Sequence, residues 1–303
     1  MGRIFHTLDV FTATPYAGNP LAVVTDTDGL DSAQMQAIAR EFNLSETVFV
    51  LPADNPAHTA KVRIFTPTTE LPFAGHPTIG TAVLLATQKY AAAERPDDAI
   101  VVLEEGIGPV RVGVRFEQDA PTFAEFDVIK LPEPDGPAAP VDRLAAALGL
   151  APNEIGFENH RSMRFSAGVP FTFVPVRNLD AIGRASVMGH HWGEAFSGDG
   201  HGAAYLYCRD TMHRSAAFHA RMFAPEMISG EDPATGSAAA AFPAVIRHFD
   251  TPPDGVHTAH LEQGYEMNRP SNIYLEFEVV AGSLRAIRVG GQAVQVMRGE
   301  LGA

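Results

Sequence analysis

The chain has 303 residues, of which 46% are hydrophobic and 19% are charged, and its formal net charge is −14. This length allows two domains with separate cores, and the composition is that of an ordinary globular protein. The negative charge and the lack of a Lys/Arg run argue against a nucleic-acid partner and against docking on anionic membranes. Cys208 is the only cysteine, which excludes an internal disulfide and a zinc site built on cysteines.

The N-terminal residues run directly into a strand pattern, without the apolar region of a secretory signal peptide. No apolar segment approaches the ~18 residues that indicate a membrane-spanning helix. We therefore expect a cytoplasmic protein that does not associate with a membrane.

The first half of the chain is predicted to alternate short strands with two helices. Apolar residues at helical spacing predict a helix that begins at Asp31 or Ser32 and ends near Asn43. Residues 44–47 are expected to link it to the next strand. Residues 78–87 predict a helix that is apolar on every side and therefore buried. The predicted strands are 4–10, 21–24, 48–51, 61–65, 100–103, 109–116 and 123–128.

A proline-rich stretch at 131–140 is the predicted linker to a second half of similar pattern. Asp142 is expected to cap a helix over 143–148, which Gly149 ends. A second helix that is apolar on all sides is predicted over 237–247. The predicted strands are 171–176, 203–208, 218–223, 272–280, 284–289 and 293–297.

Many short strands and one fully apolar helix in each half indicate sheets that curl round a helix. Closing a sheet on itself removes exposed edges, and the helix fills the interior. A doubly wound parallel fold would need regular strand–helix alternation instead. We therefore predict an α+β fold with two pseudo-symmetric domains, each a β-barrel-like sheet wrapped round a central helix. The predicted domains are 1–128 and 129–288, and a final strand near 289–303 could return to the first.

One stretch occurs twice in the sequence. Arg-Ile-Phe-Thr-Pro at 63–67 leads through a turn to His-Pro-Thr-Ile-Gly-Thr-Ala at 76–82. Arg-Met-Phe-Ala-Pro at 221–225 leads to Asp-Pro-Ala-Thr-Gly-Ser-Ala at 232–238. Each copy predicts a strand, a turn and a helix start whose exposed N–H groups can bind an anion. Two copies suggest two related domains that present helix N-termini to a shared site.

Three side chains are candidates for acid–base chemistry. Glu46 precedes an apolar strand, where burial disfavours the charged carboxylate and suits a general acid or base; a surface or capping carboxylate is the alternative. His76 begins a helix, whose N-terminus favours the neutral imidazole; a turn histidine bound to backbone is the alternative. Asp232 takes the place of His76 in the second copy, and a helix N-cap is the alternative.

Gly236 and Ser237 open the second apolar helix, and their N–H groups and the Ser hydroxyl can bind a carboxylate. Because the chain has no Gly-x-Ser-x-Gly elbow, we expect Ser237 to bind an anion rather than to act as a nucleophile. The histidines at 190–191 and at 257 and 260 have no carboxylates nearby to complete a metal site, and glycine-rich nucleotide motifs are absent. The prediction is an acid–base site with an anion cradle and no metal or other cofactor.

Four further segments complete the pattern: Asp-Val-Phe-Thr at 9–12, Gly-Asn-Pro-Leu-Ala-Val-Val at 18–24, Asn-Leu-Ser-Glu-Thr at 43–47 and Glu-Gln-Gly at 262–264. Together with the two copies of the repeat, they cover essentially the whole chain. This combination resembles the PhzF family, the phenazine-biosynthesis-type isomerases.

The resemblance implies the diaminopimelate-epimerase-like fold, with the site between two similar domains. It also implies a cofactor-independent, usually homodimeric isomerase that acts on a small carboxylate-bearing molecule, such as a dihydro-hydroxyanthranilate. Glu46 would then carry the proton, and His76 and Asp232 would assist the transfer. The residues expected to bind the substrate are Gly75, Thr235, Gly236 and Ser237.

Related racemases and epimerases of this fold use one cysteine from each domain. Neither helix start here contains a cysteine, which excludes that two-thiol mechanism. Two alternatives stay open from the sequence. One is epimerase or elimination chemistry on the same scaffold, and the other is a homologue that binds small carboxylates without turning them over.

Overall fold

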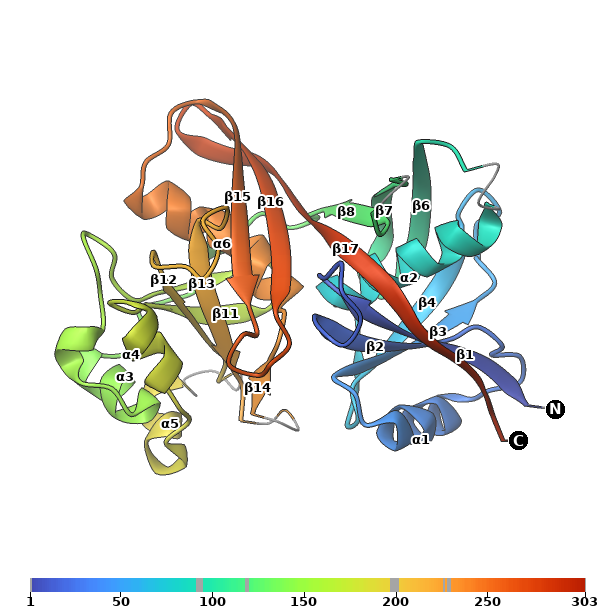
Figure 1. The fold of residues 1–303 in the computed structure, drawn as a ribbon, viewed down its shortest axis with the longest axis horizontal. Coiled ribbons are helices and arrows are strands. Elements are labelled where there is room, and N and C mark those ends of the chain that lie inside the picture. The colour runs from blue at the N-terminus through green and yellow to red at the C-terminus, as the bar shows by residue number, and fades with distance from the viewer. Residues whose placement is uncertain are drawn as a thin grey trace. The chain divides into compact units, whose positions relative to one another are not determined.

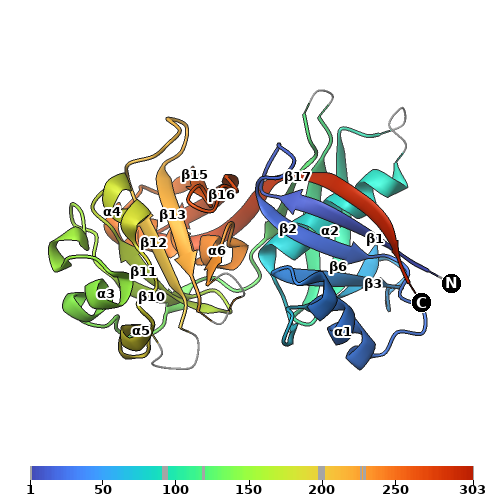
Figure 2. The same cartoon turned by 60° about the horizontal axis from the view of Figure 1, so that its bottom comes forward.

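The computed structural model describes residues 2–90, 95–117, 120–196, 202–225, 227 and 230–302. The chain divides into two compact units (Figures 1 and 2). The first comprises Met1–Asp127 and Gly290–Ala303, and the second is Val128–Val289. None of the helices in the described ranges has the length and apolar character of a membrane span.

The strands of the first unit form a closed barrel around helix α2 (Gly75–Lys89). In ring order each strand pairs with the next, and the last pairs back with the first. The order is β1 (Arg3–Val10), β2 (Asn19–Val24), β3 (Glu46–Leu51), β4 (Ala60–Phe65), β6 (Asp98–Glu105), β7 (Gly108–Arg115), β8 (Phe123–Asp127) and the C-terminal part of β17 (Ser283–Leu301). The ring leaves no open edge among these strands.

Helix α2 fills the barrel because it carries small and apolar residues on all sides. Ile79, Ala82 and Leu84 are buried, as are most other residues of the helix. Gly80 allows the close approach: a Cβ there would lie 2.6 Å from Leu21 Cδ2 and 2.7 Å from Val10 Cγ2. The predicted buried central helix is thus confirmed.

Helix α1 (Ser32–Phe42) lies outside the barrel against β3 and β4 (Figure 2). Asp31 and Gln34 form a capping box at its start, and Asn43 ends it in the left-handed conformation with φ 52°. Its buried face, Met35 and Ala39, packs against Phe49, Phe65 and Val24. These local signals explain why the sequence predicted both ends of this helix.

In the second unit, strands likewise surround helix α6 (Gly236–Phe249), which is again buried along most of its length. Phe242 of α6 packs against aromatic rings from the surrounding strands, namely Phe173, Tyr205, Tyr207 and Phe218. The strands are β10 (Met163–Ser166), β11 (Pro170–Pro175), β12 (Ala204–Cys208), β13 (Phe218–Phe223), β15 (Gly255–Gln263) and β16 (Ser271–Val280). Cys208 is buried in β12, as the apolar context predicted.

Strand pairing shows the internal repeat directly. The parallel pair β2–β3 corresponds to β11–β12, and the parallel pair β4–β6 corresponds to β13–β15. In the first unit, the two-residue strand β5 (Glu70–Leu71) pairs with β4 and precedes α2. In the second unit, β14 (Glu231–Asp232) pairs with β13 and precedes α6. The predicted α+β fold with pseudo-symmetric halves is therefore confirmed.

In the described ranges, the second unit has three helices besides its central helix α6, whereas the first unit has α1 besides α2. The three helices are α3 (Val141–Leu148), α4 (Leu179–Arg184) and α5 (Gly189–Phe196), and a 3-10 turn at Pro152–Glu154 accompanies them. They cover the face of β11 and β12 that carries Val174 and Leu206. Phe173 and Tyr205 point to the opposite face, towards α6, since successive strand residues alternate.

Several predicted boundaries were wrong. Pro140, not Asp142, is the N-cap of α3, although Gly149 ends the helix with φ 66° as expected. The two strands predicted at 284–289 and 293–297 are one long strand, β17. Part of the predicted linker forms β9 (Glu133–Pro134), which pairs with β10. Strand β15 was not predicted because it is partly exposed and its buried end is largely polar. Strand β10, which has four residues of which only Phe165 is buried, was not predicted either.

Candidate active site

Glu46 is the first residue of β3 and not part of a linker, which corrects the predicted strand start at residue 48. It follows the left-handed turn at Asn43 and lies opposite Leu21 in the parallel pair β2–β3. Its side chain is 13% exposed. Glu46 is therefore mostly removed from water, unlike the surface carboxylate of the alternative reading.

His76 lies in the first turn of α2, next to Gly75, and its side chain is 5% exposed. Its Nε2 atom lies 3.4 Å from Oε2 of Glu46. The N-cap of α2 is Ala74, whose side chain cannot accept a hydrogen bond from the backbone N–H groups of the first turn. The first unit thus brings the predicted proton carrier and the predicted histidine together.

The imidazole of His76 is neutral at physiological pH. Burial lowers its pKa to about 3, and a hydrogen bond to the backbone of Pro20 opposes this only in part. Proline has no backbone N–H, so the Pro20 carbonyl is the acceptor and a ring N–H is the donor. The contact with Glu46 therefore joins a neutral ring to a carboxyl group and is not an ion pair.

Replacement of His76 by asparagine is expected to flatten the acid side of the stability profile. A histidine whose pKa is depressed by folding takes up a proton more readily when unfolded, so the free energy of unfolding falls as the pH drops from 6.5 towards 3. Urea denaturation near pH 7 and pH 5 should show a wild-type loss that exceeds the variant's by up to ~2 kcal/mol. The control is His190→Asn, because His190 is exposed, and it should lose as much stability as the wild type. An equal loss in the wild type and in His76→Asn would contradict a buried neutral His76.

Asp232 lies in β14, where it pairs with Met222 of β13, and it is 5% exposed. Its Oδ2 atom accepts a hydrogen bond of 2.7 Å from the hydroxyl of Thr235. Thr235, not Asp232, is the N-cap of α6, which removes the capping alternative for the aspartate. Gly236 and Ser237 follow in the first turn, with Ser237 half-buried. Asp232, Thr235, Gly236 and Ser237 all lie in the second unit. That they bind the same substrate on which Glu46 acts stays a prediction.

The arginine of each repeat copy ties its strand to the short strand that precedes the central helix. Arg63 donates to both oxygens of Glu70 at 2.7 and 2.6 Å. Arg221 donates in the same way to Glu231, at 2.8 Å for both bonds, and also to the Ile182 carbonyl. Glu231 is thus part of a structural ion pair and corresponds to Glu70. Asp232 then corresponds to Leu71, and His76 corresponds to Ser237 as the second residue of its central helix, so the predicted correspondence of Asp232 with His76 was wrong.

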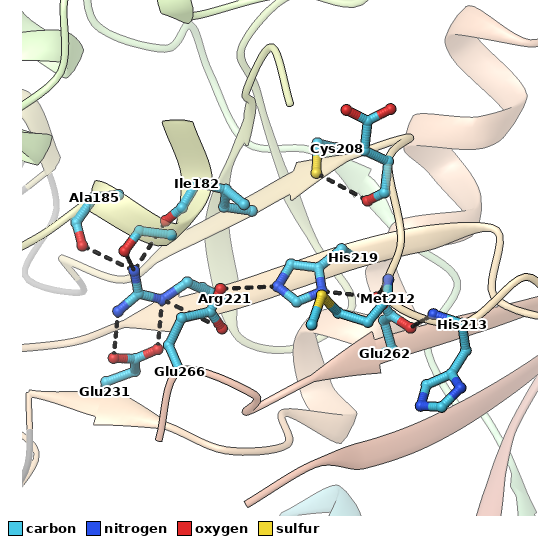
Figure 3. A network of polar contacts seen from close by, with 12 residues as sticks. Ile182, Ala185, Cys208, Met212, His213, His219, Arg221, Glu231, Glu262 and Glu266 are labelled. Carbon is cyan, nitrogen blue, oxygen red and sulfur yellow. Dashed lines mark hydrogen bonds and ion pairs between the residues drawn. The ribbon is translucent and has the colours of Figure 1, made fainter. Parts of the chain in front are cut away.

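A network of buried charges holds β13 against β15 (Figure 3). The ring of His219 contacts Glu262 at 2.8 Å and Glu266 at 3.0 Å. Burial alone would lower the pKa of His219, but the hydrogen bonds to the two carboxylates outweigh it and raise the pKa to about 9. His219 is therefore charged at neutral pH, and its stabilising effect is lost only as the pH rises through about 9.

Gln263 contacts two of the candidate site residues and was not predicted, although it lies in the Glu-Gln-Gly segment used for the resemblance. It is fully buried at the end of β15. Its Nε2 donates to the Asp232 carbonyl at 2.8 Å and to the Thr235 hydroxyl at 3.0 Å. Comparison of the residues after each central helix, not only before it, would have indicated this position.

A cavity of ≈ 1080 Å³ in the first unit does not compete with this site. Glu46 and His76 are not among its lining residues. Most of its charged groups pair with one another, as in the contacts Lys61–Asp54 and His58–Glu104, whereas Glu105, which also lines the cavity, contacts Thr78. The described ranges also contain no cluster of three or more His, Cys, Asp or Glu side chains that could hold a metal ion.

The family model of the PhzC-PhzF "Phenazine biosynthesis-like protein" matches residues 8–299. The chain belongs to this family. It is 55% identical over 296 residues to an uncharacterized isomerase of Mesorhizobium japonicum, covering 97% of this chain and 96% of the relative. It is 33% identical to the trans-2,3-dihydro-3-hydroxyanthranilate isomerase of Pseudomonas fluorescens, covering 97% of each chain.

The fold agrees with that of solved PhzF-family proteins. The crystal structure of a Bacillus anthracis phenazine biosynthesis protein of the PhzF family covers 100% of both chains with a TM-score of 0.89 and 25% identity. The resemblance predicted from the sequence motifs is thus confirmed. The named relatives show that this PhzF-family protein is an isomerase.

Proposed function

We propose that this PhzF-type isomerase moves a proton between two atoms of a small, carboxylate-bearing cyclic metabolite, with Glu46 as the proton carrier and without a metal or other cofactor. The contact between Glu46 and the neutral ring of His76 is the observation that supports this most directly. A general acid–base residue must hold a proton and release it near neutral pH, and a buried carboxyl group is suited to that.

The tautomer of His76 determines which group donates the hydrogen bond between His76 and Glu46. Nε2 faces Glu46 and makes no hydrogen bond within the described residues, so the bond to the Pro20 carbonyl uses Nδ1–H. Nε2 then carries a lone pair and can accept a hydrogen bond from the protonated carboxyl group. Because the ring is a weak base here, it orients the proton of Glu46 without taking it.

In the second unit we assign the anchoring of the substrate to the start of α6. The N–H groups of Gly236 and Ser237 point from a helix N-terminus, where the helix dipole favours a carboxylate. The hydroxyl of Ser237 adds a donor. Asp232, held by Thr235, would accept a hydrogen bond from a hydroxyl or amino group of the substrate.

Gly75 is assigned a matching role in the first unit. It is buried in the first turn of α2, beside His76, and presents its backbone without a side chain. We assign its N–H group to a polar substituent of the substrate. The size and chemistry of the substrate are inferred from the Pseudomonas fluorescens relative, which is named for a cyclic amino-hydroxy acid.

The proposal is tested by incubating the purified protein in D₂O with trans-2,3-dihydro-3-hydroxyanthranilate and with a panel of cyclohexadiene and cyclohexene carboxylates. We expect deuterium to enter one product carbon of at least one substrate, as detected by NMR. Product analysis separates isomerisation from epimerisation and elimination. Binding without conversion across the panel, measured by calorimetry, would instead favour a carboxylate-binding homologue.

A further inference from the structure

The internal repeat extends beyond the central helices. The strand after each central helix ends in a similar pair of residues followed by glycine: Glu104–Glu105 at the end of β6, before Gly106, and Glu262–Gln263 at the end of β15, before Gly264. Both glycines allow close backbone contact with the segment before the helix. A Cβ on Gly106 would lie 2.8 Å from Pro72 Cα, and one on Gly264 would lie 2.6 Å from the Pro233 carbonyl oxygen.

The first acid of each pattern fastens the loop that precedes the neighbouring strand. Glu104 accepts hydrogen bonds from the backbone of Asp54 and Asn55, each at 2.8 Å, and contacts the ring of His58. Glu262 does the same with two consecutive backbone N–H groups, those of Met212 and His213, and with the ring of His219. Glu104 and Glu262 therefore occupy equivalent positions, although their histidines do not, since His58 precedes β4 and His219 lies within β13.

The second residue of the pattern in β15 is Gln263, and it begins a chain of hydrogen bonds. Its Nε2 donates to the hydroxyl oxygen of Thr235 at 3.0 Å, and that hydroxyl donates its only proton to Oδ2 of Asp232 at 2.7 Å. The Oε1 atom of Gln263 accepts from the backbone N–H of Thr235. The amide thus determines which way the threonine hydroxyl points, and the hydroxyl orients the carboxylate of Asp232.

The second residue in β6 is Glu105, which is 8% exposed and also contacts a threonine, although Thr78 is the fourth residue of α2 whereas Thr235 is the N-cap of α6. The hydroxyl oxygen of Thr78 lies 2.7 Å from Oε1 of Glu105 and 2.8 Å from the Ala74 carbonyl oxygen. A hydroxyl has one proton, and the carbonyl can only accept. When the Thr78 hydroxyl donates its proton to the Ala74 carbonyl, the hydrogen bond between Thr78 and Glu105 requires a proton on the carboxyl group of Glu105. Thr78 follows His76 by two residues in the first turn of α2.

We propose that Glu105 and Gln263 are equivalent positioning residues, each donating to a threonine hydroxyl that holds one of the two helix starts, and that Glu105 does so as a neutral carboxylic acid. Gln263 positions Asp232, and Glu105 positions the turn that carries His76. The catalytic consequence rests on the proposed function, whereas the protonation of Glu105 does not.

The surroundings of Glu105 favour the neutral acid. Burial raises its pKa to about 8, and the Thr78 hydroxyl opposes this only in part. No charged side chain of the described residues contributes to the shift. The second oxygen, Oε2, is buried and makes no hydrogen bond within the same residues, which would be costly for an ionised carboxylate.

The first experiment compares wild type, Glu105→Gln and Glu105→Ala, with the exposed Asp98→Asn of the same strand as control. Infrared spectroscopy at pH 7 should show a protonated-carboxyl band that Glu105→Gln removes and Asp98→Asn retains. The wild type should lose stability as the pH rises from about 4.5 to about 8, because the unfolded chain releases the Glu105 proton that the folded protein retains, and Glu105→Gln should not show this loss. Absence of the band, or an unchanged loss in Glu105→Gln, overturns the assignment.

The second experiment exchanges the chemistry of the two positions. Gln263→Leu should lower kcat by ~10-fold to ~100-fold with a smaller change in KM, because a small misplacement of a reacting group costs this much. Gln263→Glu should retain turnover at acidic pH, where the introduced carboxyl group is neutral, and lose it as the pH rises. If Gln263→Leu fails to fold, the pH profile of Gln263→Glu tests the positioning role of Gln263 instead. A profile identical to that of wild type overturns the role of Gln263.

Glu105→Gln should keep kcat within about threefold of wild type, and Glu105→Ala should lower it by ~10-fold or more. Equal kcat values in both variants overturn the positioning role. The infrared and unfolding measurements require no substrate. Glu105 ionised at pH 7 therefore refutes this inference alone, whereas a wild type without turnover on every substrate refutes the proposed function alone.

Discussion

Replacement of Glu46 by glutamine is expected to lower the rate of solvent deuterium incorporation into the substrate by at least ~10²–10⁴-fold, the usual contribution of general acid–base catalysis. Glutamine has nearly the same shape but cannot take up and release a proton. The carboxyl group of Glu46 contacts the neutral His76, so the variant keeps a polar group at that contact. NMR would measure exchange, and calorimetry should show that substrate binding changes much less than turnover.

Glu41→Gln is the matched control, because Glu41 is an exposed carboxylate on helix α1 close to Glu46 in sequence. It should exchange deuterium at the wild-type rate. Undiminished exchange in Glu46→Gln would refute the assignment of Glu46 as the proton carrier. Equal losses in both variants would indicate damage to the fold around α1 rather than to the chemistry.

The second large effect is expected from Glu231→Gln, which should destabilise the protein by about 3 kcal/mol in chemical denaturation. The side chain of Arg221 is 8% exposed, and Glu231 neutralises it through two hydrogen bonds of 2.8 Å. Removal of the carboxylate leaves a buried guanidinium with incomplete compensation, although Glu266 lies 3.9 Å from its Nε.

The internal repeat provides the control for this prediction. Glu70→Gln breaks the equivalent pair with Arg63 in the first unit, where the side chains are 42% and 24% exposed. Solvent screening should limit that loss to about 1 kcal/mol or less. Equal losses in the two variants would contradict the idea that burial, rather than geometry, makes the Arg221–Glu231 pair the more important one.

Local signals in the sequence sufficed for much of the fold. The capping box at Asp31 and the left-handed Asn43 define both ends of α1. The two helices without a polar face, α2 and α6, could only be buried, and each lies against the strands of its own unit. Strands with apolar alternation, such as β7 with Val110, Val112 and Val114, were also predictable.

Other elements could not be predicted because their environment comes from distant parts of the chain. The buried end of β15 consists of Leu261, Glu262 and Gln263, and two of these are polar residues that long-range hydrogen bonds satisfy. A hydrophobic pattern does not reveal such a strand. At α3, Pro140 rather than Asp142 is the N-cap, so the local preference for an acidic cap did not decide this boundary.

By itself, the sequence determined the family, the two-fold repeat and the short list of polar residues at the helix starts, because these depend on local motifs and their spacing. Only the tertiary structure decided what each of them contacts. Parallel pairing of β2 with β3 and insertion of α2 into the barrel bring Glu46 within 3.4 Å of His76, thirty residues further along the chain. The burial that makes His76 neutral and Glu105 protonated arises from packing of the whole barrel, which no local stretch of sequence specifies.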